Sequence, residues 1–225
     1  MSAPAIIFDL DGTLIDTAPD LVDTLNVVFA SHGLRPVAYD AARTMIGGGV
    51  KRMIERGLNA EGIACAPADV DRLYAAFIDH YAAHIVDRSR PFPGLEAALD
   101  FLAARGFRLA VCTNKLEWLS VRLLDRLGLA SRFSAICGQD TFGVQKPNPE
   151  ILRRTVARAG GNMQRAVMVG DSTTDIRTAR AAGVPVAAVD FGYSEVPVTQ
   201  LGADRIISHF DDLAAVVLEL MPDAR

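Results

Sequence analysis

The sequence has few of the patterns that mark secreted, membrane-spanning or nucleic-acid-binding proteins. Its 225 residues contain 3 cysteines, and Cys65, Cys112 and Cys137 are far apart and lack CxxC spacing. This argues against a disulfide framework or a structural zinc site, and favours buried free thiols. No apolar run approaches the roughly 20 residues that cross a bilayer, and no basic leader precedes the first apolar segment. The formal net charge of −4, without a basic block, argues against nucleic acid as the main partner. We therefore expect a cytoplasmic protein that binds neither membranes nor nucleic acids.

Lysine is scarce as well. Of the 23 basic residues only Lys51, Lys115 and Lys146 are lysines, and the rest are arginines. Two of the three lie beside polar motifs at the ends of predicted strands. In a chain that almost always uses arginine, a lysine at such a place indicates a requirement for a compact ammonium group.

The C-terminal part of the chain alternates between helical and strand-like segments. A Rossmann-like α/β fold is therefore predicted, with a parallel sheet covered by helices on both faces. The predicted strands are Ala5–Asp9, Phe107–Cys112, Phe133–Cys137, Ala166–Val169, Pro185–Val189 and Ile206–Ile207. The predicted helices include Glu117–Leu127, Pro149–Ala159, Thr173–Ala182 and Asp211–Met221.

This alternation is interrupted between the first strand and Pro91. The segments there read as helices, and Pro67–Val86 carries an apolar stripe at helical spacing. We predict a core of residues 1–15 and 92–225 with an inserted helical cap domain of residues 16–91. Because the insertion follows the first strand directly, it should project from the carboxyl ends of the strands, where open α/β sheets bind ligands.

The first polar motif is Asp9-Leu10-Asp11-Gly12-Thr13-Leu14, which follows a buried strand. Asp9 and Asp11 can point to the same side of the chain, and Gly12 permits a sharp bend. Two carboxylates at 4 Å repel each other by about 4 kcal/mol at an effective dielectric constant of 20, so a divalent cation or a shared proton is expected. Oxygen ligands favour magnesium. A structural calcium loop or an acidic turn is the alternative, although the glycine position does not match that of an EF-hand.

The second motif is Gly170-Asp171-Ser172-Thr173-Thr174-Asp175, between a strand and a helix. Asp171 occupies the same strand-end position as Asp9, and Asp175 lies one helical turn further on. Helix capping by Asp171 or Ser172 is the alternative. Capping explains only one of the two acids, and it does not explain why acidic residues occur at the ends of two strands. Helix capping and metal binding are also compatible with each other.

Two further motifs supply groups that bind anions. Thr113 and Asn114 follow the strand Phe107–Cys112, and offer a hydroxyl, an amide and backbone N–H groups. Taken alone, this motif is also typical of a polar turn with an N-cap. Lys146 precedes a rigid Pro-Asn-Pro turn that begins a helix, so its backbone is fixed while its stem can reach a phosphate or carboxylate.

Together these motifs resemble the haloacid dehalogenase superfamily of phosphatases that form an aspartyl phosphate, over essentially the whole chain. The resemblance implies Asp9 as the nucleophile and Asp11 as the general acid/base. It also implies that Thr113, Asn114 and Lys146 bind the phosphate. Mg²⁺ would be shared by Asp9, Asp171 and the backbone carbonyl of Asp11, with Asp175 as a further acidic residue near the metal.

Within that superfamily, the residues from Asp9 to Thr17 and the glycines before Val50 most resemble phosphoglycolate phosphatases. Gly47, Gly48 and Gly49 would expose N–H groups to a substrate carboxylate, with help from Arg43 and Lys51. A flexible hinge with solvated basic neighbours is an equally acceptable interpretation of these five residues. The expected partner is a small phosphorylated metabolite, and the sequence does not fix the oligomeric state.

Three alternative functions stay open at this stage. A phosphomutase, or a phosphatase of small sugar phosphates, would use the same fold and the same acids. A dehalogenase fits less well, because the second acidic pair suits a metal–phosphate site. A non-enzymatic receiver that carries a phosphorylated aspartate is also less favoured, because receivers are about half this length and have no cap.

Overall fold

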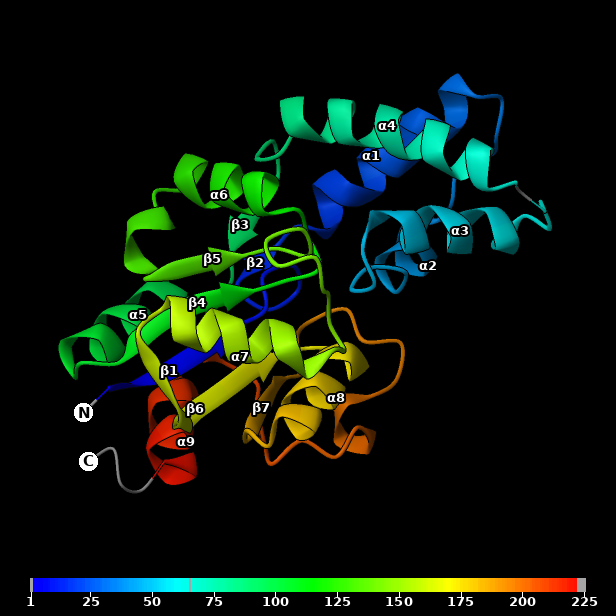
Figure 1. The fold of residues 1–225 in the computed structure, drawn as a ribbon. Helices are drawn as coiled ribbons and strands as arrows, with labels where there is room; N and C mark the ends of the chain where they lie inside the picture. Colours follow the sequence, from blue (N-terminus) through cyan, green and yellow to red (C-terminus); the bar gives the residue numbers. More distant parts are fainter. Residues whose placement is uncertain (1, 65, 222–225) are drawn as a thin grey trace.

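The computed structural model describes residues 2–64 and 66–221, and its centre is a six-stranded parallel sheet (Figure 1). Strand order is β5-β4-β1-β6-β7-β8, with every neighbouring pair parallel. The strands are β1 (Ala3–Phe8), β4 (Arg108–Cys112), β5 (Ala135–Cys137), β6 (Gly161–Gly170), β7 (Val186–Val189) and β8 (Arg205–Ile207). The chain builds outward from β1 in one direction and then from β6 in the other, so the strand order reverses between β1 and β6. Doubly wound sheets bind ligands at this reversal.

Alternation of side chains along β1 places apolar groups on both faces of the sheet. Ile6 and Phe8 belong to one buried cluster, whereas Ala5 and Ile7 belong to the other. Helices α5 (Leu95–Ala104), α6 (Glu117–Arg126) and α9 (Leu213–Leu220) contribute apolar residues to the first cluster. Helices α7 (Pro149–Arg158) and α8 (Thr173–Ala182) contribute to the second. The predicted α/β fold with helices on both faces is confirmed, and short 3₁₀ helices lie at Ala130–Arg132, Val198–Gln200 and Phe210–Asp212.

Four helices form a group of their own to one side of the sheet (Figure 1). They are α1 (Ala18–Ser31), α2 (Tyr39–Arg43), α3 (Val50–Ala60) and α4 (Pro67–Ala83). Phe29 on α1 and the pair Phe77 and Tyr81 on α4 are fully buried. Helix α3 approaches α1 closely at Gly57, where an added Cβ would lie 2.9 Å from the Phe29 ring. The apolar stripe of α4 therefore packs within this helical group.

The two chain segments that connect the helical group to the sheet lie side by side. Strand β2 (Ile15–Asp16) pairs with β3 (Arg90–Pro91) in antiparallel register. The buried carboxylate of Asp20 accepts hydrogen bonds from the backbone N–H groups of Arg88 and Ser89 at 2.9 and 2.8 Å, and from the Ser89 hydroxyl at 2.6 Å. Helix α4 ends at Ala83, three residues before the predicted end at Val86, because the chain turns there to bring Arg88 and Ser89 to Asp20.

Two further expectations concern membranes and cysteines. Within the described ranges, no helix has the length and apolar character that a membrane span requires. Cys112 and Cys137 lie opposite each other on β4 and β5 as free, buried thiols, and burial raises the pKa of Cys112 to about 12. Cys65 lies outside the described residues.

Candidate functional site

The candidate site lies where the three central strands end. Asp9 follows β1, Thr113 follows β4 and Asp171 follows β6, each as the first residue beyond its strand. Because these strands are parallel neighbours, their carboxyl ends meet at one edge of the sheet. Polar residues far apart in the sequence thus converge on the same place, as the motifs predict.

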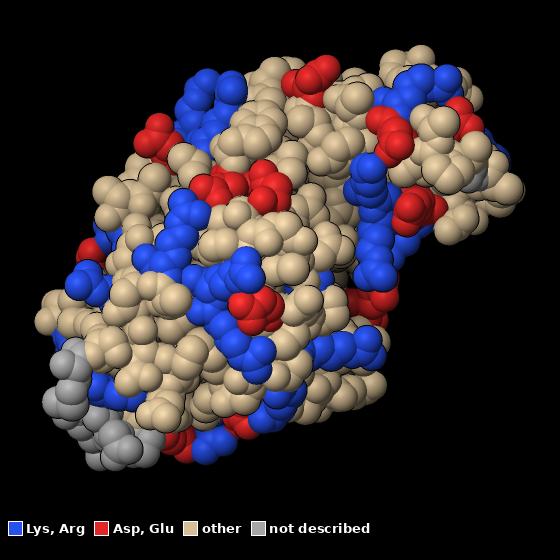
Figure 2. Space-filling view, in the orientation of Figure 1, with Lys and Arg blue, Asp and Glu red and all other residues tan. Residues whose placement is uncertain are grey.

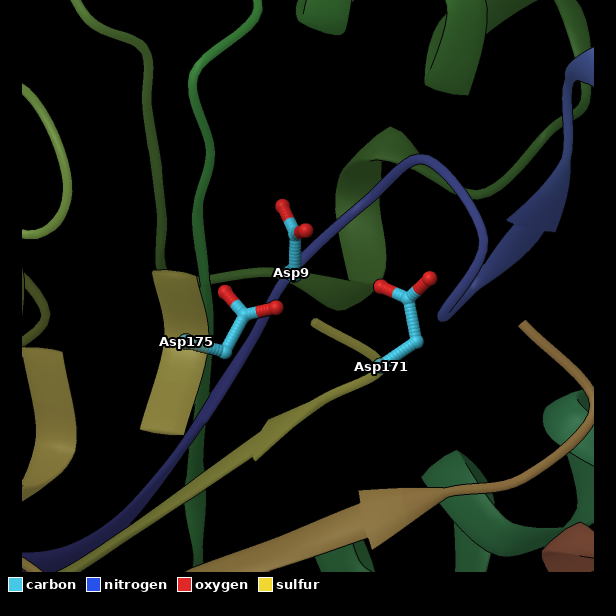
Figure 3. A group of neighbouring side chains, drawn as sticks. All are labelled: Asp9, Asp171 and Asp175. Atoms are coloured by element: carbon cyan, nitrogen blue, oxygen red, sulfur yellow. The ribbon is translucent and has the colours of Figure 1, made fainter. Parts of the chain in front are cut away.

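Asp9, Asp171 and Asp175 form a buried carboxylate cluster (Figure 3). One oxygen from each lies within 4.8 Å of the others, and the three residues are at most 3% exposed. Burial, reinforced by the neighbouring acids, raises the pKa of Asp9 to about 7 and that of Asp171 to about 8. Such a concentration of buried carboxylates requires compensation by a cation or by bound protons.

Lys146 supplies part of that compensation. Its ammonium lies 2.8 Å from Oδ1 of Asp9 and donates a hydrogen bond to Oδ1 of Asp175 at 2.6 Å. Burial lowers the pKa of Lys146, but the charges of Asp175 and Asp9 outweigh burial and raise it overall. Oδ2 of Asp175 accepts from the Ser172 hydroxyl and N–H, which completes a capping box at the start of α8. The capping alternative is therefore correct for Ser172, which is the N-cap residue, and Asp175 completes the capping box while also holding Lys146 toward Asp9.

Asp171 is held by groups from two other segments of the chain. Its Oδ1 accepts from the Thr13 hydroxyl at 3.1 Å, and its Oδ2 accepts from the backbone N–H of Tyr193 at 2.7 Å. The chain leaves little space around this carboxylate, because an added Cβ would lie 2.5 Å from Asp171 Oδ2 at Gly12 and 2.2 Å from Asp171 Cβ at Gly192. The side chain is thereby fixed with its carboxylate beside Asp9.

This arrangement fits a divalent metal ion. Oδ1 of Asp9 accepts no hydrogen bond of acceptable geometry from the described residues, although it contacts the Lys146 ammonium. Hard oxygen donors, mutual repulsion and an oxygen with spare acceptor capacity are the properties of a site for an ion such as Mg²⁺ or Ca²⁺. Asp9 and Asp171 are the candidates to hold it, since Asp175 already pairs with the Lys146 ammonium, whereas among the described residues Asp171 accepts hydrogen bonds only from neutral donors.

Asn114 connects the end of β4 to the lysine. Its Nδ2 donates to the Lys146 carbonyl at 3.2 Å, and its Oδ1 accepts from the Lys146 N–H at 2.9 Å. Thr113 accepts a hydrogen bond from the N–H of Lys115 at 3.2 Å and lies on the pocket wall. Thr113, Asn114 and Lys146 are thus brought together with Asp9.

Asp11 is not part of the three-acid cluster, and its carboxylate pairs with Lys115, one of the scarce lysines that the sequence did not assign to the site. The Lys115 ammonium donates to both oxygens of Asp11, at 2.9 and 3.1 Å. Oδ1 of Asp11 also accepts from the Thr17 hydroxyl at 2.8 Å. The scarcity of lysine was the only signal for Lys115, since its partner is 104 residues away in the sequence.

Asp9 and Asp11 open onto a pocket between the sheet and the helical group, with about 560 Å³ of empty space including its mouth. Much of its wall is apolar, and consists of Leu21, Ile46, Val50, Met53, Ile78, Leu116 and Leu119. Tyr81 also lines it, and the Tyr81 hydroxyl is buried with no hydrogen-bond partner among the described residues. An unpaired buried hydroxyl lowers the stability of the fold by about 1–3 kcal/mol. A ligand that forms a hydrogen bond with it gains binding free energy of the same order. Tyr81 was not identified from the sequence, where it reads as one position of an apolar stripe.

The five predicted cap residues divide into separate groups. Gly47 and Gly49 line the pocket, while Gly48 and Lys51 line a neighbouring cavity. The Lys51 ammonium is exposed and lies 2.5 Å from Asp71. Arg43 donates to the carbonyls of Phe191 and Gly192 at 3.1 and 2.9 Å, which ties α2 to the loop that holds Asp171. In Figure 2, the surface is indented where the helical group meets the core, and basic side chains occur in short groups between acidic and uncharged ones.

Comparison with known proteins agrees with this geometry. The family model described as haloacid dehalogenase-like hydrolase matches residues 6–189, from β1 to the end of β7. The chain belongs to the haloacid dehalogenase-like hydrolases. The expected family is thus confirmed, and the match spans the ends of β1, β4 and β6 together with the helical insertion.

Relatives in this hydrolase family match nearly the whole chain. A phosphoglycolate phosphatase from Mesorhizobium japonicum is 49% identical over 219 residues, which is 97% of this chain and 96% of the relative. A predicted phosphoglycolate phosphatase from Haemophilus somnus has a solved structure with a TM-score of 0.88 and 27% identity, and the match covers 96% of this chain and 98% of that one. The structure of CbbY from Rhodobacter sphaeroides, solved in complex with phosphate, has a TM-score of 0.78 and 26% identity. The match covers 97% of this chain and 100% of that one.

Proposed function

We propose that this hydrolase cleaves phosphomonoesters through a phosphorylated Asp9, and that its substrate is 2-phosphoglycolate, which it converts to glycolate and phosphate. The observation that carries the proposal is the position of Asp9, which borders the pocket, contacts Lys146 and lies beside Asp171. A carboxylate placed between an ammonium and a metal-type acidic cluster is suited to attack an anionic phosphoryl group, because the cations offset its repulsion from the phosphate.

The reaction proceeds in two displacements. In the first, a carboxylate oxygen of Asp9 attacks phosphorus, the bond from phosphorus to the ester oxygen breaks, and Asp11 gives a proton to the leaving glycolate oxygen. In the second, water attacks the phosphorus of the acyl phosphate, its proton passes to Asp11, and the bond from phosphorus to Asp9 breaks. Asp11 and Asp9 line the same pocket, so one residue can serve both leaving group and water.

Different residues would hold the phosphate and the metal in this proposal. Thr113, Asn114 and Lys146 bind the phosphoryl oxygens, with Asp175 keeping Lys146 in place. Asp9, Asp171 and the backbone carbonyl of Asp11 would hold Mg²⁺, which neutralises charge on the phosphoryl oxygens when bound. The oxygen-only donor set of the buried cluster supports Mg²⁺ over softer metals.

We further propose that residues 16–91 act as a cap domain over a core of residues 1–15 and 92–225. In support, the two connections are joined by β2 and β3, and the pocket lies between the two parts. Gly47, Gly48 and Gly49 contribute backbone groups before α3, whereas Arg43 fastens the cap to the core and Lys51 lies toward the neighbouring cavity. We place the reaction in the cytoplasm, in keeping with free thiols at Cys112 and Cys137.

The choice of substrate is supported by relatives named phosphoglycolate phosphatase at identities up to 49%. Neither nucleic acid nor a membrane surface is needed for the reaction.

The test is release of inorganic phosphate from a panel containing 2-phosphoglycolate, hexose phosphates and nucleoside monophosphates, with Mg²⁺ and with a chelator. We expect turnover of 2-phosphoglycolate in Mg²⁺ and none in the chelator. We also expect Asp9→Asn to abolish this turnover. Asp100→Asn is the matched control, because Asp100 is exposed and pairs with Arg132 on the surface. Preference for a hexose phosphate, or conversion of it to an isomer, would favour a phosphomutase or sugar phosphatase. A stable phosphoprotein without turnover would favour a receiver.

A further inference from the structure

Lys115 is the one lysine or arginine among the described residues that line the pocket. Its side chain is 4% exposed and its ammonium reaches both oxygens of Asp11. The same ammonium lies 4.5 Å from the centre of the Tyr81 ring. The pocket thus holds a single buried cation, fixed between the sheet and α4.

Tyr81 adds a polar group beside this cation. Its ring is fully buried in the helical group, yet its hydroxyl has no hydrogen-bond partner among the described residues. Buried hydroxyls in folded proteins are almost always paired, so an unpaired one on a pocket wall indicates a place for a ligand atom. Lys115 and Tyr81 come from different parts of the chain and meet on the same pocket.

The position of Lys115 relative to Asp11 defines where a second anionic group of the substrate can lie. In the proposed reaction, Asp11 is within hydrogen-bond reach of the ester oxygen that leaves phosphorus. The Lys115 ammonium is 2.9 Å from Asp11. An anionic group bound to Lys115 must therefore be attached very near that oxygen. In a 2-hydroxy acid, the hydroxyl and the carboxylate are on adjacent carbons, which meets this requirement.

We propose that Lys115 and Tyr81 form the receptor for the substrate carboxylate, and that they select phosphate esters of short 2-hydroxy acids. This inference rests on the proposed phosphatase function. When substrate binds, the Lys115 ammonium exchanges its hydrogen bonds with Asp11 for hydrogen bonds with the carboxylate, and the Tyr81 hydroxyl donates to the same group. Met53, Ile78 and Leu119, which form part of the same wall, give no partners for the hydroxyls of a sugar.

The competing basic side chains for the carboxylate are Arg43 and Lys51. Arg43 is occupied by the carbonyls of Phe191 and Gly192, and lies over the Tyr193 ring at 4.9 Å. Lys51 pairs with Asp71 and is 54% exposed, whereas Lys115 is buried. A carboxylate bound to an exposed ammonium gains little, because water already solvates both groups.

The experiment compares 2-phosphoglycolate with 2-hydroxyethyl phosphate, in which a neutral alcohol replaces the carboxylate. We expect Lys115→Met to lower the ratio of kcat/KM for 2-phosphoglycolate to kcat/KM for 2-hydroxyethyl phosphate by about 10–100-fold. This is the loss in affinity expected when a hydrogen bond between charged groups is removed. Tyr81→Phe removes only a hydroxyl that has no protein partner, so it leaves folding intact, and we expect a reduction of about 3–10-fold in the same ratio. Lys51→Met is the matched control, because it removes the competing lysine by the same substitution, and we expect it to leave the ratio unchanged.

Three results would overturn the inference. An equal loss of kcat/KM for both compounds in Lys115→Met would mean that Lys115 serves Asp11 alone. An unchanged ratio in both Lys115→Met and Tyr81→Phe would mean that neither residue binds the carboxylate. A selective loss in Lys51→Met would move the carboxylate to the outer side of the cap.

A binding measurement separates failure of this inference from failure of the proposed function. Calorimetric titration of Asp9→Asn, which holds substrate without turnover, should give tighter binding of 2-phosphoglycolate than of 2-hydroxyethyl phosphate. That difference should disappear in the double variant Asp9→Asn/Lys115→Met. If the wild-type protein hydrolyses neither compound, the phosphatase function fails, while this titration still supports or overturns the carboxylate receptor.

Discussion

The ammonium of Lys146 donates a 2.6 Å hydrogen bond to Asp175, and this pair is buried with side chains at most 1% exposed. Asp175 in turn caps α8 through Ser172. The lysine that faces Asp9 is thus held by the first turn of a helix, so the position of the charge depends on the same residue that stabilises the helix.

We expect Asp175→Asn to lower kcat/KM for phosphate release by at least about 100-fold and to destabilise the fold by about 3–5 kcal/mol. The physical reason is that a buried lysine is left without its strongest partner. Phosphate release and urea denaturation measure the two effects. The control is Glu150→Gln, which removes an exposed ion pair with Arg154 and should cost no more than about 0.5 kcal/mol. Full activity in Asp175→Asn would show that Lys146 needs no fixed partner.

The carboxylate cluster predicts how stability changes with pH when metal is removed. Burial and neighbouring acids raise the pKa of Asp171 from 3.8 to about 8, and that of Asp9 to about 7. Between the unfolded and folded values, the folded chain keeps protons that the unfolded chain has released. Stability in a chelator should therefore fall as pH rises from about 4, and this decrease should end above about pH 8.

Thermal unfolding in a chelator from pH 5 to 9 measures this slope. Asp171→Asn removes the main titrating group and should flatten the curve, whereas Asp100→Asn on the surface should leave it as in the wild type. An Asp171→Asn curve as steep as that of the wild type would assign the dependence to other groups.

Divalent cations should stabilise the wild-type protein, because they relieve repulsion between Asp9 and Asp171. We expect the melting temperature to rise when Mg²⁺ is added in excess of its dissociation constant, and the rise to disappear in Gly192→Ala. An added Cβ at Gly192 would lie 2.2 Å from Asp171 Cβ and displace that carboxylate.

Gly106→Ala is the control for the glycine substitution. Gly106 has a φ of +80° and nothing near its added Cβ, so the variant should lose about 1–2 kcal/mol through backbone strain alone. It should nevertheless keep the full response to Mg²⁺. A normal response in Gly192→Ala would mean that Asp171 does not hold the ion.

Asp20 joins the two connections between the helical group and the sheet, and its substitution should weaken that junction. We expect Asp20→Asn to lower the free energy of unfolding by about 1.5–3 kcal/mol, because the N–H and hydroxyl groups of Arg88 and Ser89 lose a charged acceptor. Urea denaturation checks this value. Asp23→Asn is the control, since Asp23 pairs with the Arg88 side chain at the surface. Equal stability of the two variants would contradict the role given to Asp20.

Local patterns were sufficient to predict much of the fold. The segment Thr173–Ala182 forms the helix that its capping residues and Gly183 predict. The strand before Asp9 is buried on both faces, as its continuous apolar run indicates. By contrast, β2 and β3 contain two residues each and are fixed only by their pairing across the insertion, so no local pattern reveals them.

The candidate site divides in the same way. Asp9, Thr113 and Asp171 stand at strand ends, a position that local sequence can indicate. The partners of Asp11 and Asp171 depend on tertiary contacts instead: Lys115 comes from the end of β4, and Tyr193 lies 22 residues beyond Asp171. Tyr81 looks like any other apolar position of α4, because only the packed structure shows that its hydroxyl has no partner.

The adjacent pairing of β2 with β3 has an evolutionary consequence. The chain leaves the core through β2 and returns through β3, and these two strands pair with each other. The segment between them can therefore be lengthened, shortened or replaced without a change in the strand order of the core. New selectivity can therefore arise by exchange of one contiguous stretch of coding sequence, while the phosphoryl-transfer machinery below is inherited unchanged.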